Sequence, residues 1–246
     1  MRLLFAFLLG AYTAQAAIAV VTHGTQKCNG GPCTTGNLVL DTTGATAIIA
    51  TVNTASGANC ATSGVTAFND SRGNTWVKGT PSIDSTCTSQ WRAYSPSGAA
   101  LSVGAGHTFS AAGSFLSFEI LALSGTTPGT DPLNKEGAGT HTASATSLAA
   151  SAILCDNPDS IVVTTLAAHA ATTGGYSATA FTTADSISFT SGQTAGLGTA
   201  YLLQPGSPAT VTPLWSGLNS SGNMSTTIAC YNGVQAASVR RKVVIQ

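Results

Sequence analysis

One short stretch crowds together groups that could do chemistry: residues 68–76, FNDSRGNTW. In the whole chain 7% of the residues are charged, against roughly a quarter in ordinary globular proteins. Asp70, Asn69 and Asn74 offer the hard oxygen donors that calcium prefers. A calcium site needs several carboxylates, however, and the next acid along the chain is Asp84.

The same residues favour a turn. Asp and Asn side chains bond to the backbone two residues on, and Gly73 can take a positive φ at low cost. Because the flanking runs 65–68 and 75–78 have strand character, the sequence predicts a hairpin loop of about five residues. Phe68 and Trp76 then point into one core, and we expect a turn here and no metal ligand.

Glu119 is the most unusual acid, because it lies in the apolar run FLSFEIL. If its side chain pointed inward, its pKa would rise. Glycoside hydrolysis would need a second, facing carboxylate, for which Asp70 and Asp131 are the candidates. Strand alternation places Phe118 and Ile120 on one face and Glu119 on the other, which favours a half-exposed sheet face.

The four histidines form no pair at metal-ligand spacing. His107, in VGAGHTF, is expected to bridge a loop to a strand, and His23, His141 and His169 are scattered, with no HExxH motif. The G-x-S-x-G elbow of one large class of serine hydrolases is also missing. The sequence therefore predicts no catalytic residue, no metal site and no cofactor.

Exposed aromatic rings could stack on a sugar. The candidates for such a ligand-binding platform are Trp215, Trp91 and Tyr176. Trp215 is the strongest, because PLWSGLNSSGN reads as a loop, where binding residues tend to lie. Packing of the tryptophans in the core is the alternative.

The N-terminus has the pattern of an export signal. Arg2 precedes an apolar run over residues 3–12, and Ala14-Gln15-Ala16 forms an A-x-A cleavage site. The run is too short to span a membrane. We therefore expect residues 1–16 to be a signal peptide and the protein to be secreted, extracellular or on a cell or virion surface, a buried first strand being the alternative.

Six cysteines follow the expected signal. An even number in an exported chain favours disulfides. Of 15 possible pairings, the preferred one is Cys28–Cys33, Cys60–Cys87 and Cys155–Cys230. Zinc is the alternative, but there is no CxxC pair and no histidine beside a cysteine.

Charge limits the partners. Lys plus Arg and Asp plus Glu balance at nine each, so no field attracts nucleic acid. A hydroxyl-rich, nearly uncharged surface loses little when it is buried, because few ions need desolvating. We expect the partners to be copies of the chain itself, other surface or virion proteins, or glycans.

Short apolar or alternating runs, separated by clusters of Gly, Pro, Asn and Ser, predict an all-β sandwich of about a dozen strands. The expected strands are residues 18–22, 37–40, 46–53, 65–68, 75–78, 89–94, 107–110 and 115–123, then 161–168, 176–182, 186–190, 199–204, 210–214 and 226–231.

The two groups of strands repeat in order. Residues 46–53 parallel 161–168, 91–98 parallel 199–206, and the run FEILALSG parallels TTIACYNG. We expect two similar halves, each contributing strands to both sheets of one jelly-roll-like sandwich. Two separate domains are the alternative.

The expected sandwich domain covers residues 17–235, with residues 126–151 as a connection that crosses it. Residues 236–246 differ in kind, because three positive charges precede an apolar, strand-like end. We expect this tail to be a last edge strand or a strand donated to another subunit.

The string DSRGNTW, preceded by DTTGATAIIATVN and followed by WRAYSP and VGAGHTF, resembles a family of uncharacterised exported and phage-associated β-sandwich proteins. The resemblance runs from about residue 17 to residue 233. It implies the fold and carries no activity or catalytic residue to this chain.

Together these patterns predict a non-catalytic extracellular structural or adhesive protein, such as a self-assembling surface, fibre or virion component. The alternatives are a carbohydrate-binding module that uses Trp215 or Trp91 and, with less support, a hydrolase centred on Glu119.

Overall fold

The computed structural model describes residues 17–27, 38–54, 65–83, 87–95, 100–113, 117–169, 175–190, 194–218 and 222–234. Within these ranges the chain forms eighteen strands and no helix, which confirms the all-β prediction. The predicted signal peptide and the tail 236–246 lie outside the described residues. A jelly-roll connectivity, as distinct from a β-sandwich, stays a prediction.

The first half of the chain contains nine strands: β1 (Ala19–Lys27), β2 (Leu38–Leu40), β3 (Ala47–Thr54), β4 (Val65–Asp70), β5 (Trp76–Lys78), β6 (Ser82–Ile83), β7 (Cys87–Ala93), β8 (His107–Gly113) and β9 (Ser117–Ser124). The second half contains the other nine: β10 (Leu133–Glu136), β11 (Thr140–Thr142), β12 (Leu148–Ala149), β13 (Ser160–His169), β14 (Ser177–Ala178), β15 (Thr182–Thr190), β16 (Thr194–Gln204), β17 (Leu214–Ser216) and β18 (Met224–Asn232).

The strands form four antiparallel sheets. The inner N-sheet has the order β1-β9-β3-β7-β5, with β6 also paired to β7, and the outer N-sheet has the order β2-β8-β4. The inner C-sheet has the order β10-β18-β13-β16-β15, with β11 also paired to β18, and the outer C-sheet has the order β12-β17-β14. The five-strand and three-strand orders therefore repeat in the two halves, as the sequence parallels predicted, whereas the short strands β6 and β11 attach to strands that do not correspond.

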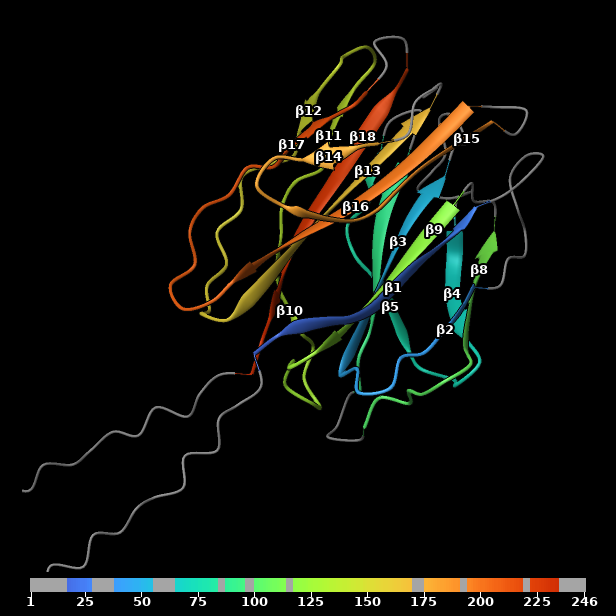
Figure 1. Ribbon diagram of the computed structural model, residues 1–246, viewed down its shortest axis with the longest axis vertical. Helices are drawn as coiled ribbons and strands as arrows, with labels where there is room; N and C mark the ends of the chain where they lie inside the picture. Colours follow the sequence, from blue (N-terminus) through green and yellow to red (C-terminus); the bar gives the residue numbers. More distant parts are fainter. Residues whose placement is uncertain are drawn as a thin grey trace, which may run out of the picture.

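The prediction that each half supplies strands to both sheets is wrong. Every sheet comes from one half, so the cool-coloured first half and the warm-coloured second half lie on opposite sides of the molecule (Figure 1). The stretch 126–151 is also more than a connection, because it holds β10, β11 and β12. These strands are two to four residues long, too short for a clear alternating pattern.

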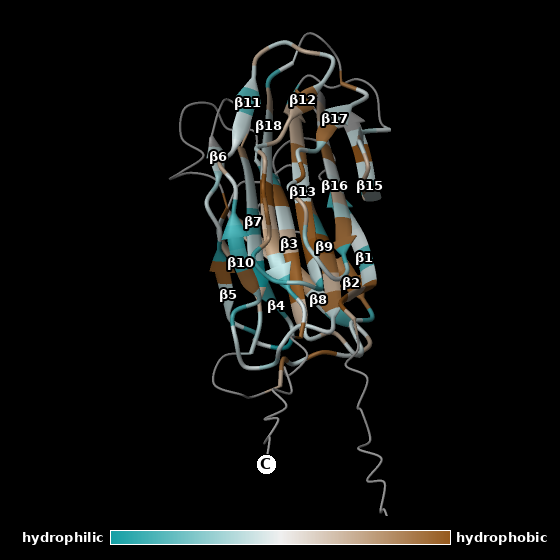
Figure 2. Ribbon diagram, turned by 90° about the vertical axis from the view of Figure 1, so that its left-hand side faces the viewer, coloured by the Kyte–Doolittle hydropathy of each residue, from teal (hydrophilic) through white to brown (hydrophobic). Residues whose placement is uncertain are grey.

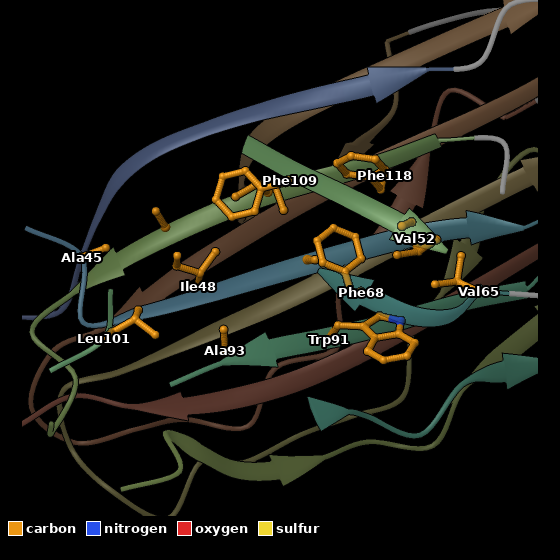
Figure 3. Packing of buried hydrophobic residues seen from close by; sticks show 14 residues of the cluster. Ala45, Ile48, Val52, Val65, Phe68, Trp91, Ala93, Leu101, Phe109 and Phe118 are labelled. Atoms are coloured by element: carbon orange, nitrogen blue, oxygen red, sulfur yellow. The ribbon is translucent and has the colours of Figure 1, made fainter. Parts of the chain in front are cut away.

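Three apolar layers hold the four sheets together. Phe68, Trp91, Phe109 and Phe118 fill the space between the outer and inner N-sheets (Figure 3), and Trp215 and Tyr176 do so between the inner and outer C-sheets. The third layer joins the two inner sheets, and its buried members are Ile18, Ala47, Ile49, Leu121, Leu123, Ile161, Val163, Ala229 and Tyr231. Brown, hydrophobic segments accordingly run along β3, β9, β13 and β16 (Figure 2).

The contact between the two inner sheets is apolar at one end and polar at the other. In the polar part the Thr51 and Thr199 hydroxyls are 2.8 Å apart, and Asn53 donates to the Gly196 carbonyl over 2.7 Å. Gln90 accepts a 2.8 Å hydrogen bond from the buried Tyr231 hydroxyl. Polar side chains on these faces are therefore buried between the halves instead of facing water.

Candidate functional site

The turn that follows β4 is organised around the carboxylate of Asp70. Its Oδ1 accepts hydrogen bonds from the backbone N–H groups of Arg72 at 2.8 Å and Asn74 at 3.3 Å. Its Oδ2 accepts one from the Trp76 indole at 2.8 Å. The side chain is 0% exposed. Both oxygens of this carboxylate therefore accept hydrogen bonds from residues of the same turn.

The turn itself differs from the predicted hairpin. β4 pairs with β8 in the outer N-sheet, whereas β5 pairs with β7 in the inner N-sheet, so residues 71–75 carry the chain from one sheet to the other. Phe68 and Trp76 do point into one core, with their ring centroids 4.6 Å apart. The prediction of a shared core is confirmed, and the hairpin is wrong because spacing does not reveal which strand each run pairs with.

His107 bridges the loop at Thr42 to Asp70, the last residue of β4, as its sequence context predicted. Its Nδ1 lies 2.9 Å from the Thr42 hydroxyl, and its Nε2 lies 3.3 Å from Asp70 Oδ1. Burial lowers the pKa of His107, and the nearby Asp70 opposes that shift. Burial alone would raise the pKa of Asp70, but hydrogen bonds from Trp76 and the turn backbone bring it below its ordinary value.

Gly73 has a φ of +70° and nothing within 4 Å of the position that a Cβ would occupy. Gly73→Val is therefore expected to destabilise the fold through backbone strain alone, by about 1–3 kcal/mol. Gly73→Asn is the matched control, because asparagine tolerates this conformation and should cost less. Equal losses for Val and Asn in urea denaturation would contradict the strain argument.

The three predicted sugar-binding aromatics are buried. Trp215 is 0% exposed, Tyr176 is 1% exposed and Trp91 is 5% exposed. Trp215 donates to the Thr164 hydroxyl at 3.2 Å, and burial raises the pKa of Tyr176 to about 12. The prediction that Trp215 sits on an exposed loop is wrong. Trp215 lies on β17, the central strand of the outer C-sheet, and its side chain packs against the inner C-sheet.

One predicted disulfide is confirmed, the bond between Cys155 and Cys230. Cys87 is also disulfide-bonded. The remaining cysteines, Cys28, Cys33 and Cys60, lie outside the described residues, so the pairings Cys28–Cys33 and Cys60–Cys87 stay predictions.

Glu119 does not lie on a half-exposed face. It is 1% exposed, because the inner C-sheet covers the face of β9 that alternation assigned to solvent. Burial, together with the nearby charge of Asp185, raises the pKa of Glu119 well above its ordinary value. Neither of its carboxylate oxygens has a hydrogen-bond partner in the described part of the chain.

The acid beside Glu119 is Asp185, and neither predicted partner is near. Asp70 belongs to the turn described above, and Asp131 accepts two hydrogen bonds from Arg92, at 2.6 and 2.7 Å. Asp185 lies on β15, and its Oδ2 atom is 3.0 Å from Nδ1 of His23 on β1. Glu119, Asp185 and His23 offer ligand atoms that all lie within 4.8 Å of one another.

Sequence reasoning missed His23 and Asp185 because they are 162 residues apart and meet only when the two inner sheets pack together. A signal was present, since each is an ionisable residue in the middle of a strand that otherwise carries hardly any charge.

Searches with protein-family models, among curated proteins and among solved structures return no match to this chain. The resemblance carried by DSRGNTW therefore stays a prediction. Among the described residues, no helix has the length and hydropathy of a membrane span.

Proposed function

We propose that this chain is a non-catalytic extracellular structural or adhesive protein that assembles with copies of itself through the open edges of its inner sheets. The observation that carries the proposal is the pair of edge strands β1 and β15. Each is nine residues long, and in the described part of the chain each pairs on one side only, β1 with β9 and β15 with β16.

These two edges lie together on one side of the molecule, where the contact between His23 and Asp185 joins them. The edges on the other side are much shorter, with three residues in β5, two in β6, four in β10 and three in β11. One side of the molecule therefore offers two long, adjacent rows of backbone donors and acceptors.

Both long edges are poorly protected against pairing. Proteins that avoid edge association use charges, proline or bulges on edge strands. Lys27 and Asp185 are the charged residues of β1 and β15, and neither strand contains proline. Each has a bulge near its N-terminal end, between Val20 and Thr22 and between Thr183 and Asp185, which leaves the remainder regular and free to accept a strand.

The alternative functions have less support. A glycan platform would need exposed rings, whereas Trp215, Trp91 and Tyr176 are buried. A hydrolase would need a substrate to reach Glu119, which is 1% exposed. The C-terminal tail stays a predicted donor for an open edge.

The assembly proposal is tested by placing charges on the edges. Val21→Lys on β1, which is 38% exposed, combined with Ser188→Lys on β15, should shift the protein from oligomer to monomer in sedimentation velocity, because like charges disfavour edge pairing. The melting temperature of the double variant should fall only modestly, because Val21 is exposed and Ser188 is a small, partly buried side chain on an edge strand.

Leu214→Lys is the matched control. Leu214 is 43% exposed but lies on β17, in the middle of the outer C-sheet, so this variant should assemble as the parent does. An oligomer that survives the double substitution would refute assembly through β1 and β15.

A further inference from the structure

Glu119 is a buried carboxylate with little compensation, because the neighbouring Thr199 hydroxyl favours its charged form only in part and is itself shared with Thr51. Both of its oxygens lack a hydrogen-bond partner in the described residues, and so does the buried hydroxyl of Thr25, which faces Glu119 across the β1–β9 pair. An isolated buried charge is costly unless it is paired or coordinates a metal ion, and buried polar side chains are normally satisfied. The unpartnered atoms point to a group that the described part of the chain does not supply.

Two further ligand residues converge on the same point. His23 comes from β1 and Asp185 from β15, the edge strands of the two inner sheets, and their side chains are 42% and 28% exposed. With Glu119 from β9, the three side chains present ligand atoms within 4.8 Å of one another. Solvent can therefore reach the cluster at His23, whereas Glu119 forms its buried end.

We propose that His23, Glu119 and Asp185 bind a divalent transition-metal cation of the zinc type, which joins the edge of the first half to the edge of the second. The choice of metal follows from the donor atoms. One imidazole and two carboxylates suit zinc and similar transition-metal ions, whereas calcium and magnesium favour sites made of oxygen alone.

The charges are consistent with a bound cation. Two carboxylates face one imidazole, and basic residues of the described chain lie elsewhere: Lys27 is at the exposed end of β1, Arg92 is paired with Asp131, and Lys135 is paired with Asp156. A divalent cation would neutralise both carboxylates and give Glu119 the partner that it lacks. Three protein ligands leave one position of a tetrahedral ion open to water.

This inference does not rest on the proposed function, because it concerns a contact within one molecule. The probe is zinc chloride added to metal-free protein, followed by isothermal titration and by thermal unfolding. We expect one ion per chain and, at a free concentration 100 times the dissociation constant, a rise in melting temperature of about 5–10 °C.

Glu119→Gln keeps the shape of the side chain and removes its charge, so it should fold and lose zinc affinity by more than the roughly 10–100-fold that loss of an outer-shell partner costs. His23→Ala and Asp185→Asn should behave alike. His141→Ala removes another exposed histidine, on β11 away from the cluster, and should bind as the parent does.

Two outcomes would overturn the inference. One is zinc binding that persists in Glu119→Gln or disappears in His141→Ala, which would place the ion elsewhere. The other is a parent protein that does not respond to zinc while Glu119→Gln melts at a higher temperature, which would mean that Glu119 is simply a protonated acid between the sheets.

Discussion

Trp215→Ala is expected to lower the free energy of unfolding by about 3–5 kcal/mol, the usual cost of truncating a large buried aromatic side chain. The ring is 0% exposed and fills the space against the inner C-sheet, where a Cβ on Gly198 would come within 2.8 Å of it. The indole N–H also donates a hydrogen bond to the Thr164 hydroxyl, and this bond would be lost. Urea denaturation measures the effect.

Leu214→Ala is the matched control for this prediction. Leu214 precedes the tryptophan on the same strand but is 43% exposed, so its truncation should change the stability by about 0.5 kcal/mol or less. A Trp215→Ala protein as stable as the parent would mean that the ring is exposed, and the glycan-binding alternative would then regain its platform.

Asp70→Ala is expected to cost about 3 kcal/mol, since it leaves three partly buried donors without their charged acceptor. An ordinary exposed turn aspartate would cost only about 1 kcal/mol. The difference arises because Asp70 binds the N–H groups of Arg72, Asn74 and Trp76 while its own side chain is 0% exposed.

The pH dependence of this loss follows from the depressed pKa of Asp70. A carboxyl group whose pKa is lower in the folded state stabilises the fold above its unfolded pKa, about 3.9, and this contribution is lost as the pH falls through the folded value. The gap between parent and Asp70→Ala should therefore be full at pH 7 and shrink below about pH 3.9. A gap of about 1 kcal/mol at pH 7, or a parent protein whose melting temperature rises with added calcium, would contradict this account of the turn.

The sequence predicted most long strands and their repeated order, because apolar alternation and β-branched residues report local conformation. Both β3 and β13 were expected within one residue of their observed starts, residues 47 and 160. The assignment of strands to sheets failed, since alternation says which residues share a face and nothing about which strands are neighbours. The hairpin expected between β4 and β5 failed for the same reason.

Glu119 shows more clearly what strand alternation cannot predict. Alternation correctly separated it from Phe118 and Ile120, which lie in the core of the first half. It could not show that the opposite face is covered as well, because Thr51, Asn53 and Glu119 read as a solvent face. Only the packing of the two inner sheets buries these groups and brings Asp185 beside Glu119.

Electron microscopy of the protein from residue 17 to residue 246, over a series of increasing concentrations, tests the proposed assembly most directly. We predict filaments or sheets in which copies meet along β1 and β15, and their disappearance in the Val21→Lys, Ser188→Lys double variant. Isolated particles of monomer size at every concentration would contradict the proposal that this chain is an assembling structural protein.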